Sequence, residues 1–199
     1  MLINLKKSNI NIDNIFISSD FHFRHVNICR GVSTWNNKDE NCRDFDNEID
    51  MSNKIVENIN SIVKKDNILI HLGDIAFGKI ENTYELFDRL ECKNLILING
   101  NHCHEHSLKH SSILYQVDYL ELRCRNNLLI TCFHYPMTIW NECHKNSLNL
   151  FGHSHGKHQP KGRSKDVGLD TNNLFPYKLT DVIKELEQIP IYSPNELSH

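Results

Sequence analysis

The stretch "LNLFGHSHGKHQP" at residues 148–160 places two histidines, His153 and His155, directly after a short apolar run. The run "LNLF" is bounded by turn residues, which is typical of a short buried β-strand. Gly152 and Gly156 enclose the two histidines, and we expect them to give the backbone the tight geometry that presents both imidazoles. Histidine is the commonest metal ligand in proteins. The stretch therefore raises the question of whether other strands of this chain also end in metal ligands.

The composition is that of a globular domain. The chain has 199 residues, of which 39% are hydrophobic and 24% are charged, values that argue against disorder. The net charge of −3 with neutral histidine gives no overall basic character for binding nucleic acid. Histidine is unusually frequent, with 13 residues, and this favours a metal site or an acid–base site.

The chain carries no sequence signal for export or for a membrane. The N-terminal segment "MLINLKKSNINIDN" lacks the apolar core of a signal peptide, and no stretch approaches the ~18 consecutive apolar residues of a membrane span. The 7 cysteines include no CxxC pair and have no framework spacing. We therefore expect a cytoplasmic protein with free thiols and no membrane partner. The sequence carries no signal for an oligomeric state.

Short apolar runs alternate with helical periodicity along the chain. Besides 148–151, the apolar runs that predict strands are 15–18, 68–72, 95–98 and 128–133, with 167–169 as a further candidate. The segments with helical spacing are 46–64, 82–92 and a last helix with Thr180 as its N-cap and Pro190 after its end. This alternation predicts an α/β fold. We expect residues 1–199 to form a single domain, with a core at about 15–187 and a tail at 188–199.

A potential metal ligand follows each of the first five strands. In order along the chain, these residues are Asp20 and His22, Asp74, Asn101 and His102, His134, and His153 with His155. The carboxyl ends of strands in an α/β sheet lie at one edge, so the ligands should gather there. In extended backbone, the side chains of Asp20 and His22 would point to the same side, and so would those of His153 and His155. Mixed carboxylate, amide and imidazole ligands suit Mn, Fe, Co, Ni or Zn, and this number suits two ions about 3.5–4 Å apart.

The ordered motifs resemble those of the metallophosphoesterase, or calcineurin-like phosphoesterase, superfamily. The matching residues are "DFH" at 20–22, "GD" at 73–74, "GNH" at 100–102, "H" at 134 and "GHSH" at 152–155. The stretches "SDFHFRHVNI", "HLGDIAFG", "FHYP" and "DVGLD" resemble a compact bacterial and phage branch of this superfamily. The resemblance covers about residues 15–187, and it implies a four-layer α/β/β/α sandwich.

The resemblance also implies a role for each ligand position. Asp20, His22 and His155 would hold a first metal ion, and Asn101, His134 and His153 a second, with Asp74 bridging the two. The implied reaction is hydrolysis of a phosphodiester or phosphomonoester, through attack on phosphorus by a hydroxide that bridges the ions. His102 would be the catalytic acid that protonates the leaving oxygen or stabilises the transition state. Cys103 departs from the pattern, because much of the family has an acidic residue at this position.

Several residues near the motifs have two interpretations. Arg24 could contact a phosphate or carry a solvated charge, and His25 and Asn27 could contact substrate or have a structural role. Arg163, with Lys161 and Lys165, could form a phosphate-facing edge or lie on an exposed loop. Asp166 and Asp170 could orient a histidine or cap a strand.

A separate zinc site within "HCHEH" at 102–106 is disfavoured, because its ligands are crowded and no second Cys/His pair has finger spacing.

These observations favour a phosphoesterase that acts on a small, nucleotide-type substrate with two divalent ions such as manganese. One alternative is a metal-dependent nuclease, which is less favoured because 199 residues leave no room for a domain that grips DNA. The other is a metal-binding protein on the same scaffold that has lost catalysis. The replacement of the usual acidic residue by Cys103 could cause such a loss.

Overall fold

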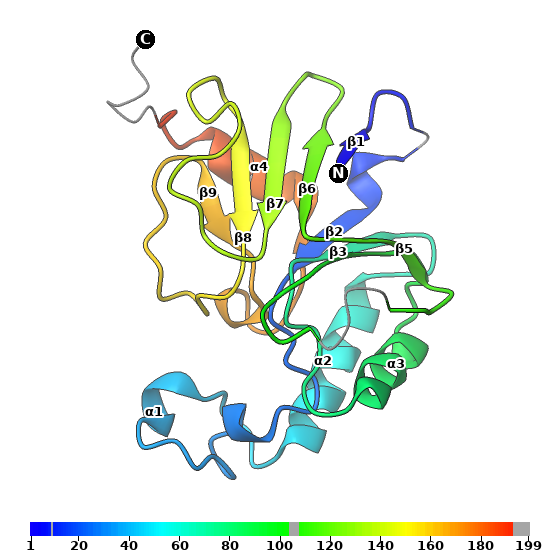
Figure 1. Ribbon diagram of the computed structural model, residues 1–199, viewed down its shortest axis with the longest axis vertical. Helices are drawn as coiled ribbons and strands as arrows, with labels where there is room; N and C mark the ends of the chain where they lie inside the picture. Colours follow the sequence, from blue (N-terminus) through cyan, green and yellow to red (C-terminus); the bar gives the residue numbers. More distant parts are fainter. Residues whose placement is uncertain (9, 104–107, 193–199) are drawn as a thin grey trace.

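The computed structural model describes residues 1–8, 10–103 and 108–192, and its strands form two five-stranded sheets (Figure 1). The first sheet has the order β10 (Tyr177–Lys178), β2 (Ile15–Ser18), β3 (Ile68–His71), β4 (Leu95–Ile98) and β5 (Ile113–Val117). The second has the order β1 (Leu2–Asn4), β6 (Tyr119–Arg123), β7 (Leu129–Phe133), β8 (Leu148–Phe151) and β9 (Ser164–Asp166). The fold is therefore mixed α/β, as the alternation of strands and helices predicts.

Most strand pairs are parallel. Only β10 with β2 and β6 with β7 pair antiparallel among the described strands. The strands that precede the expected ligands are β2, β3 and β4, which are neighbours in the first sheet, and β7 and β8, which are neighbours in the second. Because these neighbours run parallel, the segments that follow them leave the sheets at the same end.

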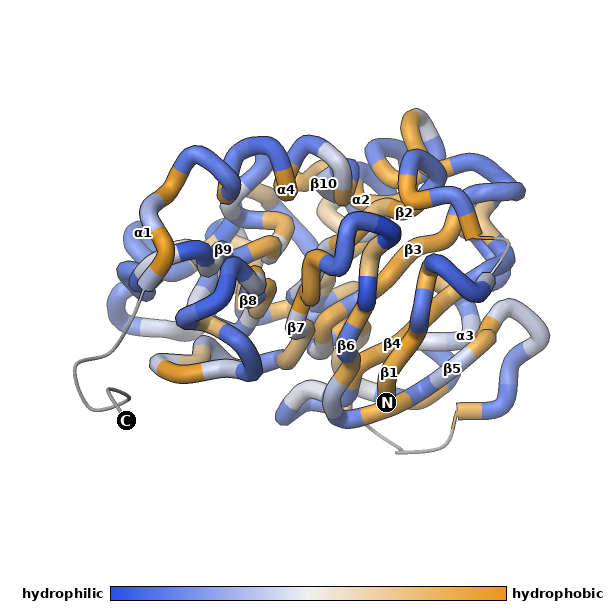
Figure 2. Tube along the Cα trace, turned by 90° about the horizontal axis from the view of Figure 1, so that it is seen from above, coloured by the Kyte–Doolittle hydropathy of each residue, from blue (hydrophilic) through white to orange (hydrophobic). Residues whose placement is uncertain are grey.

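Two clusters of buried side chains separate the layers. One cluster lies between the sheets and contains Ile70 of β3 and Ile130 of β7. The other lies on the outer face of the first sheet, where helices α2 (Glu48–Ile62) and α3 (Ile80–Arg89) cover it. Figure 1 shows these two helices on one side of β2, β3 and β5, with β6 to β9 on the other. Figure 2 shows hydrophobic residues along the strands and hydrophilic residues in the outer loops.

Helix α2 illustrates why these elements form where they do. The side chain of Asn47 accepts hydrogen bonds from the backbone N–H groups of Ile49 and Asp50, so the first turn is capped. Met51, Ile55 and Ile59 follow at four-residue spacing and are fully buried. The predicted helices at 46–64 and 82–92 are thus confirmed as α2 and α3, within two or three residues at each end.

The five predicted strands that precede the ligands are confirmed as β2, β3, β4, β7 and β8. The prediction lacked the other five strands, β1, β5, β6, β9 and β10, and three of its details are wrong. The run 167–169 is not a strand: β9 ends at Asp166, and Leu169–Thr171 form a 3-10 helix. Thr180 is not an N-cap, because helix α4 (Leu179–Glu187) follows β10 directly and begins one residue earlier. The ordered core also begins before residue 15, because β1 pairs with β6 and Ile3 is buried between the sheets. A strand of three residues is too short to give a periodic signal.

A short segment between β2 and α2 projects from the two sheets. It contains the 3-10 helix Val26–Ile28 and helix α1 (Lys38–Asn41), which lies apart from the other elements in Figure 1. Another 3-10 helix, Ile12–Asn14, precedes β2. None of the helices in the described ranges has both the length and the apolar composition that crossing a bilayer requires. Of the predicted tail, residues 193–199 lie outside the described part of the chain.

Candidate metal centre

Two groups of potential metal ligands meet where β2, β3, β7 and β8 end. Asp20, His22 and His155 form the first group, and Asp74, His134 and His153 form the second. Within each group, the ligand atoms lie within 4.8 Å of one another. The structure thus brings together six of the seven predicted ligands in two clusters, and it places His153 and His155 in different clusters. These clusters combine side chains from both sheets, so the site depends on how the sheets pack.

The backbone of these residues is not extended, contrary to the interpretation of the i, i+2 pairs. Asp20 and His22 have φ angles of 55° and 49°, Asp74 has 58°, and His153 and His155 have 66° and 49°. Non-glycine residues adopt this left-handed region rarely, at an order of 1–3 kcal/mol each, and such residues concentrate at functional sites. The ligands therefore converge through tight turns after the strands end, rather than through the alternation of a strand.

Two glycines of the loop after β8 have a structural explanation. A Cβ at Gly152 would lie 2.0 Å from Ser19 Oγ and 2.4 Å from Asp20 Oδ2, so any side chain there would displace a ligand. Gly156 has a φ of 77°, the conformation that glycine adopts without strain. The expectation that Gly152 and Gly156 shape this loop is supported, the first by space and the second by conformation.

The first group contains buried polar atoms that lack partners. Asp20 Oδ1 and both ring nitrogens of His22 have no hydrogen bond among the described residues, although both side chains are almost fully buried. His22 Nε2 lies 3.8 Å from Asp20 Oδ1. Burial raises the pKa of Asp20 to about 6, and burial together with Arg43 lowers the pKa of His22 well below its ordinary value. Unpartnered buried polar atoms are rare, and a lone carboxylate oxygen beside a neutral imidazole fits a divalent cation.

The second group offers a neutral imidazole beside a carboxamide oxygen. His134 Nδ1 lies 2.7 Å from the carbonyl oxygen of Leu72, which can only accept, so Nδ1 carries the proton and Nε2 keeps its lone pair. That Nε2 lies 2.9 Å from the carboxamide oxygen of Asn101. Burial lowers the pKa of His134, which keeps the ring neutral. Two lone pairs therefore face each other, an arrangement that a cation between them would stabilise. Asn101, the seventh predicted ligand, thus lies with this group.

Asp74 lies between the two groups. Its Oδ2 is 3.9 Å from Nε2 of His22 in the first group and 3.6 Å from Nε2 of His134 in the second. Its Oδ1 accepts the backbone N–H of His102 at 2.9 Å, which fixes the orientation of the carboxylate. The geometry is consistent with the bridging role that the resemblance implies, because one carboxylate oxygen faces a ligand of each group.

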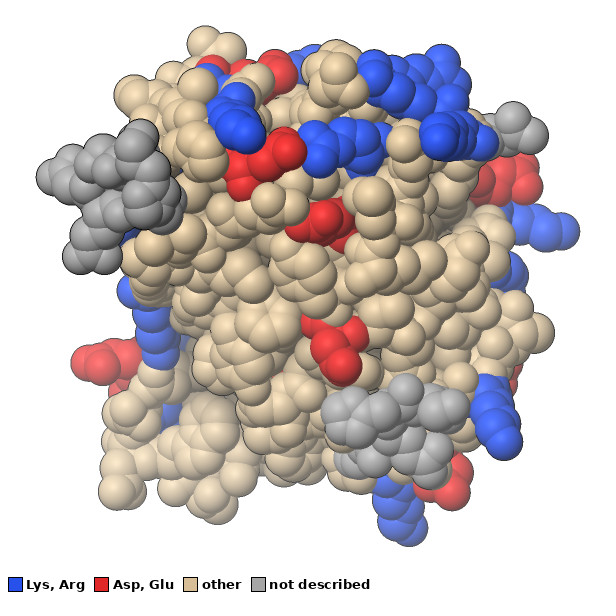
Figure 3. All heavy atoms as spheres, turned by 45° about the horizontal axis from the view of Figure 1, so that its top comes forward, with Lys and Arg blue, Asp and Glu red and all other residues tan. Residues whose placement is uncertain are grey.

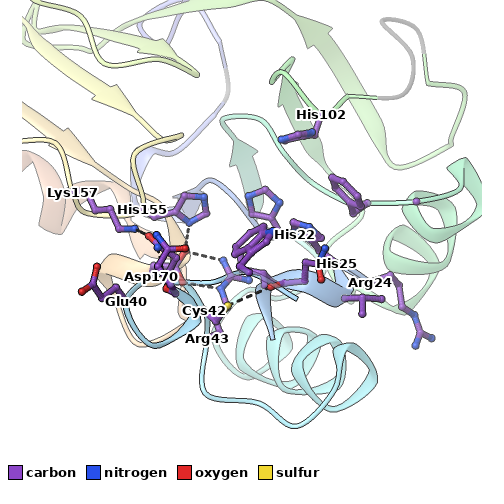
Figure 4. A pocket seen from close by; sticks show the side chains of 18 residues that line it. His22, Arg24, His25, Glu40, Cys42, Arg43, His102, His155, Lys157 and Asp170 are labelled. Atoms are coloured by element: carbon purple, nitrogen blue, oxygen red, sulfur yellow. Dashed lines mark hydrogen bonds and ion pairs between the residues drawn. The ribbon is translucent and has the colours of Figure 1, made fainter. Parts of the chain in front are cut away.

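An ion pair between the buried Arg43 and the partly exposed Asp170 positions His155. Asp170 Oδ2 accepts from His155 Nδ1 at 2.6 Å, and both carboxylate oxygens also accept from Arg43, at 2.7 and 2.9 Å. Arg43 donates in addition to the carbonyl oxygens of Asp20 and Phe21. Burial lowers the pKa of His155, but the hydrogen bond to Asp170 and the negative charges of Asp20 and Asp170 together outweigh it, so the pKa lies above its ordinary value. Figure 4 shows His155, Asp170 and Arg43 joined by these bonds.

This arrangement decides the role of Asp170 in favour of orienting a histidine. A carboxylate that fixes the tautomer of a ligand histidine leaves Nε2 of that ring free for a metal. Burial opposes ionisation of Asp170, but Arg43 holds its pKa far below the ordinary range. Sequence reasoning missed Arg43, because a lone arginine in the polar run "NCRDFDN" gives no signal.

Asp166 organises the loop between the two histidines. Its Oδ2 accepts from Ser154 Oγ at 2.6 Å and from the Gly156 N–H at 2.9 Å, and its Oδ1 accepts from the Gly168 N–H at 2.7 Å. Because Ser154 stands between His153 and His155, these bonds hold the turn that separates the two imidazoles.

His102 and Cys103 lie beside the two groups. The ring of His102 is 6.0 Å from the ring of His22, centroid to centroid, and the residue is exposed. Cys103 Sγ accepts the backbone N–H of Gly100 at 2.9 Å, and burial raises the pKa of this thiol. The thiol thus closes the turn that carries Asn101 and His102. The other residues of the crowded "HCHEH" motif, His104 to His106, lie outside the described residues.

A cavity of about 990 Å³ opens next to the first group, and several residues predicted to contact substrate line it. His25 is buried and stacks on Phe77 at 3.9 Å between ring centroids, and burial lowers its pKa to about 4. Asn27 lines the same cavity and accepts from Thr34. Arg24 also lines it, but its guanidinium forms two hydrogen bonds to Glu85 and points away from the histidines (Figure 4).

The structure does not bring Arg163 to this site. The residue follows the loop at the other end of β9, and its guanidinium donates to the carbonyl oxygens of Ile189 and Glu187, at 2.7 and 2.9 Å. These bonds tie the start of β9 to the end of α4. Arg163 therefore links two secondary-structure elements. The phosphate contact that the sequence suggested for it is not supported.

Comparisons with other proteins match this chain over most of its length. No protein-family model matches it. The uncharacterized protein MJ1445 of Methanocaldococcus jannaschii is 25% identical over 183 residues, which cover 87% of this chain and 92% of that protein. The crystal structure of the protein of unknown function AQ665 from Aquifex aeolicus superposes with a TM-score of 0.63 at 20% identity, and the match covers 86% of this chain and 98% of that one. This chain therefore shares its fold with a solved protein.

Proposed function

We propose that this protein is a two-metal phosphoesterase of the metallophosphoesterase type, which hydrolyses a phosphodiester or phosphomonoester of a small, nucleotide-type substrate. The observation that carries the proposal is the pair of ligand groups with Asp74 between them. Buried acceptor atoms without partners in the first group, and the imidazole nitrogen of His134 beside the carboxamide oxygen of Asn101 in the second, fit two divalent cations such as Mn, Fe, Ni, Co or Zn. The four-layer α/β/β/α sandwich belongs to the same proposal, and the two sheets with α2 and α3 would supply three of its layers.

The protein's own residues would hold the ions, orient the substrate and supply a proton. Two divalent ions supply a nucleophile from water at neutral pH and neutralise negative charge on the phosphoryl oxygens. Asp20, His22 and His155 would hold one ion, and Asn101, His134 and His153 the other. Asp170 and Arg43 keep His155 in the tautomer whose Nε2 is free. His102 is exposed beside His22, where it can donate a proton to a leaving oxygen.

Hydrolysis by metal-stripped protein with single metals restored tests the proposal. The substrates are bis-p-nitrophenyl phosphate and p-nitrophenyl phosphate, and the metals are Mn, Ni, Zn, Co and Mg. We expect metal-dependent release of p-nitrophenol that is lost in Asp74→Ala and His134→Ala. His144→Ala is the matched control, because His144 is exposed and belongs to neither ligand group. A fully active Asp74→Ala variant would contradict the proposal.

The same experiment separates the alternatives. Protein that binds two ions but hydrolyses neither ester, in wild type and in Cys103→Asp, would indicate a metal-binding protein without turnover. Cleavage of single-stranded or double-stranded DNA in preference to small esters would indicate a nuclease. A broad basic surface would favour the nuclease, but on the face drawn in Figure 3 the Lys and Arg residues lie mainly along one edge, beside Asp and Glu.

A further inference from the structure

The cavity beside the first ligand group has an aromatic lining. Its wall includes Trp35, His25 and Phe77. His25 is sandwiched in this wall: its ring stacks on Phe77 at an interplanar angle of 16° and meets the Trp35 ring edge-on, at 5.9 Å between centroids. Trp35 is 38% exposed, although tryptophan side chains are on average highly buried. The cavity therefore presents a large flat apolar surface close to the candidate metal ligands.

The charges in the cavity do not fit a second anionic group. Arg43 is paired with Asp170 through two hydrogen bonds, and Arg24 is paired with Glu85 in the same way. Lys157 also lines the cavity, and Glu40 lines it with the opposite charge. The positive charges are thus largely balanced by carboxylates. A second phosphate would therefore be attracted only weakly to the cavity. An uncharged aromatic ring does not depend on such attraction.

Carboxamides complete the lining. Asn27, Asn37 and Asn41 all line the cavity. Asn27 uses its oxygen to accept from Thr34, and its amide nitrogen has no hydrogen bond to any other described residue. Carboxamide groups pair with the ring nitrogens and exocyclic groups of nucleobases, and aromatic side chains stack on base faces. The volume of about 990 Å³ lies at the upper end of the range for small-ligand sites.

We propose that this cavity is a nucleobase subsite, in which Trp35 stacks on the base of a nucleoside phosphate whose phosphoryl group lies at the two ligand groups. This inference rests on the proposed function and names the part of the substrate that the segment between β2 and α2 recognises. It also gives that projecting segment a role, since Asn27, Trp35 and Asn37 all belong to it.

Binding of two phosphates that differ only in the base tests the subsite. The ligands are adenosine 5′-monophosphate and ribose 5-phosphate, with dissociation constants measured by calorimetry in the presence and absence of Mn²⁺. We expect the nucleotide to bind at least 10-fold more tightly, within the ~5- to 100-fold that stacking of one base contributes. Trp35→Ala should reduce this ratio to about threefold or less, and Trp35→Phe should retain most of it, because a ring is kept.

The matched control is Tyr115→Ala, which removes an aromatic ring that is 47% exposed on β5, outside the cavity. The control should leave the ratio unchanged. Three results would overturn the subsite. They are equal affinity for both ligands, failure to bind either ligand, and a ratio of dissociation constants that is unchanged in folded Trp35→Ala protein. Because hydrolysis is not measured, a protein that is inactive on every ester but shows the Trp35-dependent ratio would keep the subsite and refute the phosphoesterase.

Discussion

Replacement of Asp20 by Asn should stabilise the metal-free protein while it abolishes metal binding. Asp20 is fully buried, and burial raises its pKa from 3.8 to about 6. Asn is nearly isosteric and keeps an oxygen that can accept the His153 N–H, the bond that Asp20 makes at 2.8 Å. A carboxyl group whose pKa is raised in the folded state destabilises the fold when it ionises. The substitution removes this cost.

The magnitude follows from the pKa shift. A rise from 3.8 to about 6 corresponds to about 3 kcal/mol of unfolding free energy at pH 7.5, where Asp20 is ionised in both states. Below pH ~3.8 the carboxyl group is protonated in both states, so the cost is absent. Between these limits the stability of the wild type falls relative to Asp20→Asn as pH rises. At neutral pH the variant should melt ~6–12 °C higher.

Urea denaturation of metal-stripped protein at pH 7.5 and at pH 4 measures this difference. Asp66→Asn is the control, because Asp66 is exposed and should give no difference at either pH. Restored Mn²⁺ should reverse the order, since an ion at about 1,000 times its dissociation constant stabilises the wild type by about 4 kcal/mol, more than the difference of about 3 kcal/mol, and the variant lacks the carboxylate that would hold this ion. A metal-free Asp20→Asn protein that is less stable than wild type at pH 7.5, or equally more stable at both pH values, would refute the reasoning.

Three further predictions concern the groups around the ligands. Arg43→Ala should destabilise the fold by about 3 kcal/mol, because it removes a buried partner from the Asp170 carboxylate, whose side chain is 20% exposed. Asp170→Asn in the same chain should restore part of the loss, and additive losses in a double-mutant cycle would contradict this. Gly152→Ala should abolish binding of the ion held by the first group, measured by calorimetry, because its Cβ would overlap Asp20. Gly156→Ala, whose Cβ meets only Thr171 at 3.2 Å, should cost about 1 kcal/mol and keep binding. Equal effects would argue against the close approach. Cys103→Ala removes the acceptor for the Gly100 N–H and should lower the unfolding free energy by about 1 kcal/mol, with Cys103→Asp restoring it; an unchanged melting temperature in Cys103→Ala would show that the thiol does not hold this turn.

The sequence by itself determined the elements that dominate the fold and the identity of the candidate ligands. The runs at β2, β3, β4, β7 and β8 are short, apolar and bounded by turn residues. Each can therefore be predicted as a strand from its own residues, without knowledge of the strands that pair with it. Helices α2 and α3 have a 3.6-residue pattern that is equally local. The ligands stand next to strand ends in the sequence, and the resemblance to known motifs orders them. The strands β1, β9 and β10 were missed because two or three residues carry no period. The strands β5 and β6 were missed because polar residues interrupt their apolar runs and several of their side chains are only partly buried.

The resemblance implied which ligands share an ion, but only the tertiary structure decided how they converge and what holds them. The division of His153 and His155 between two groups depends on left-handed turns, whose φ angles no residue pattern specifies at non-glycine positions. Arg43 reaches Asp170 across 127 positions of sequence, and Arg163 turns from a candidate phosphate contact into a link between β9 and α4. These long-range contacts arise because the two sheets pack on one core and thereby bring separate loops to a common edge. The partner of a charged side chain thus depends on which loops this packing places next to it.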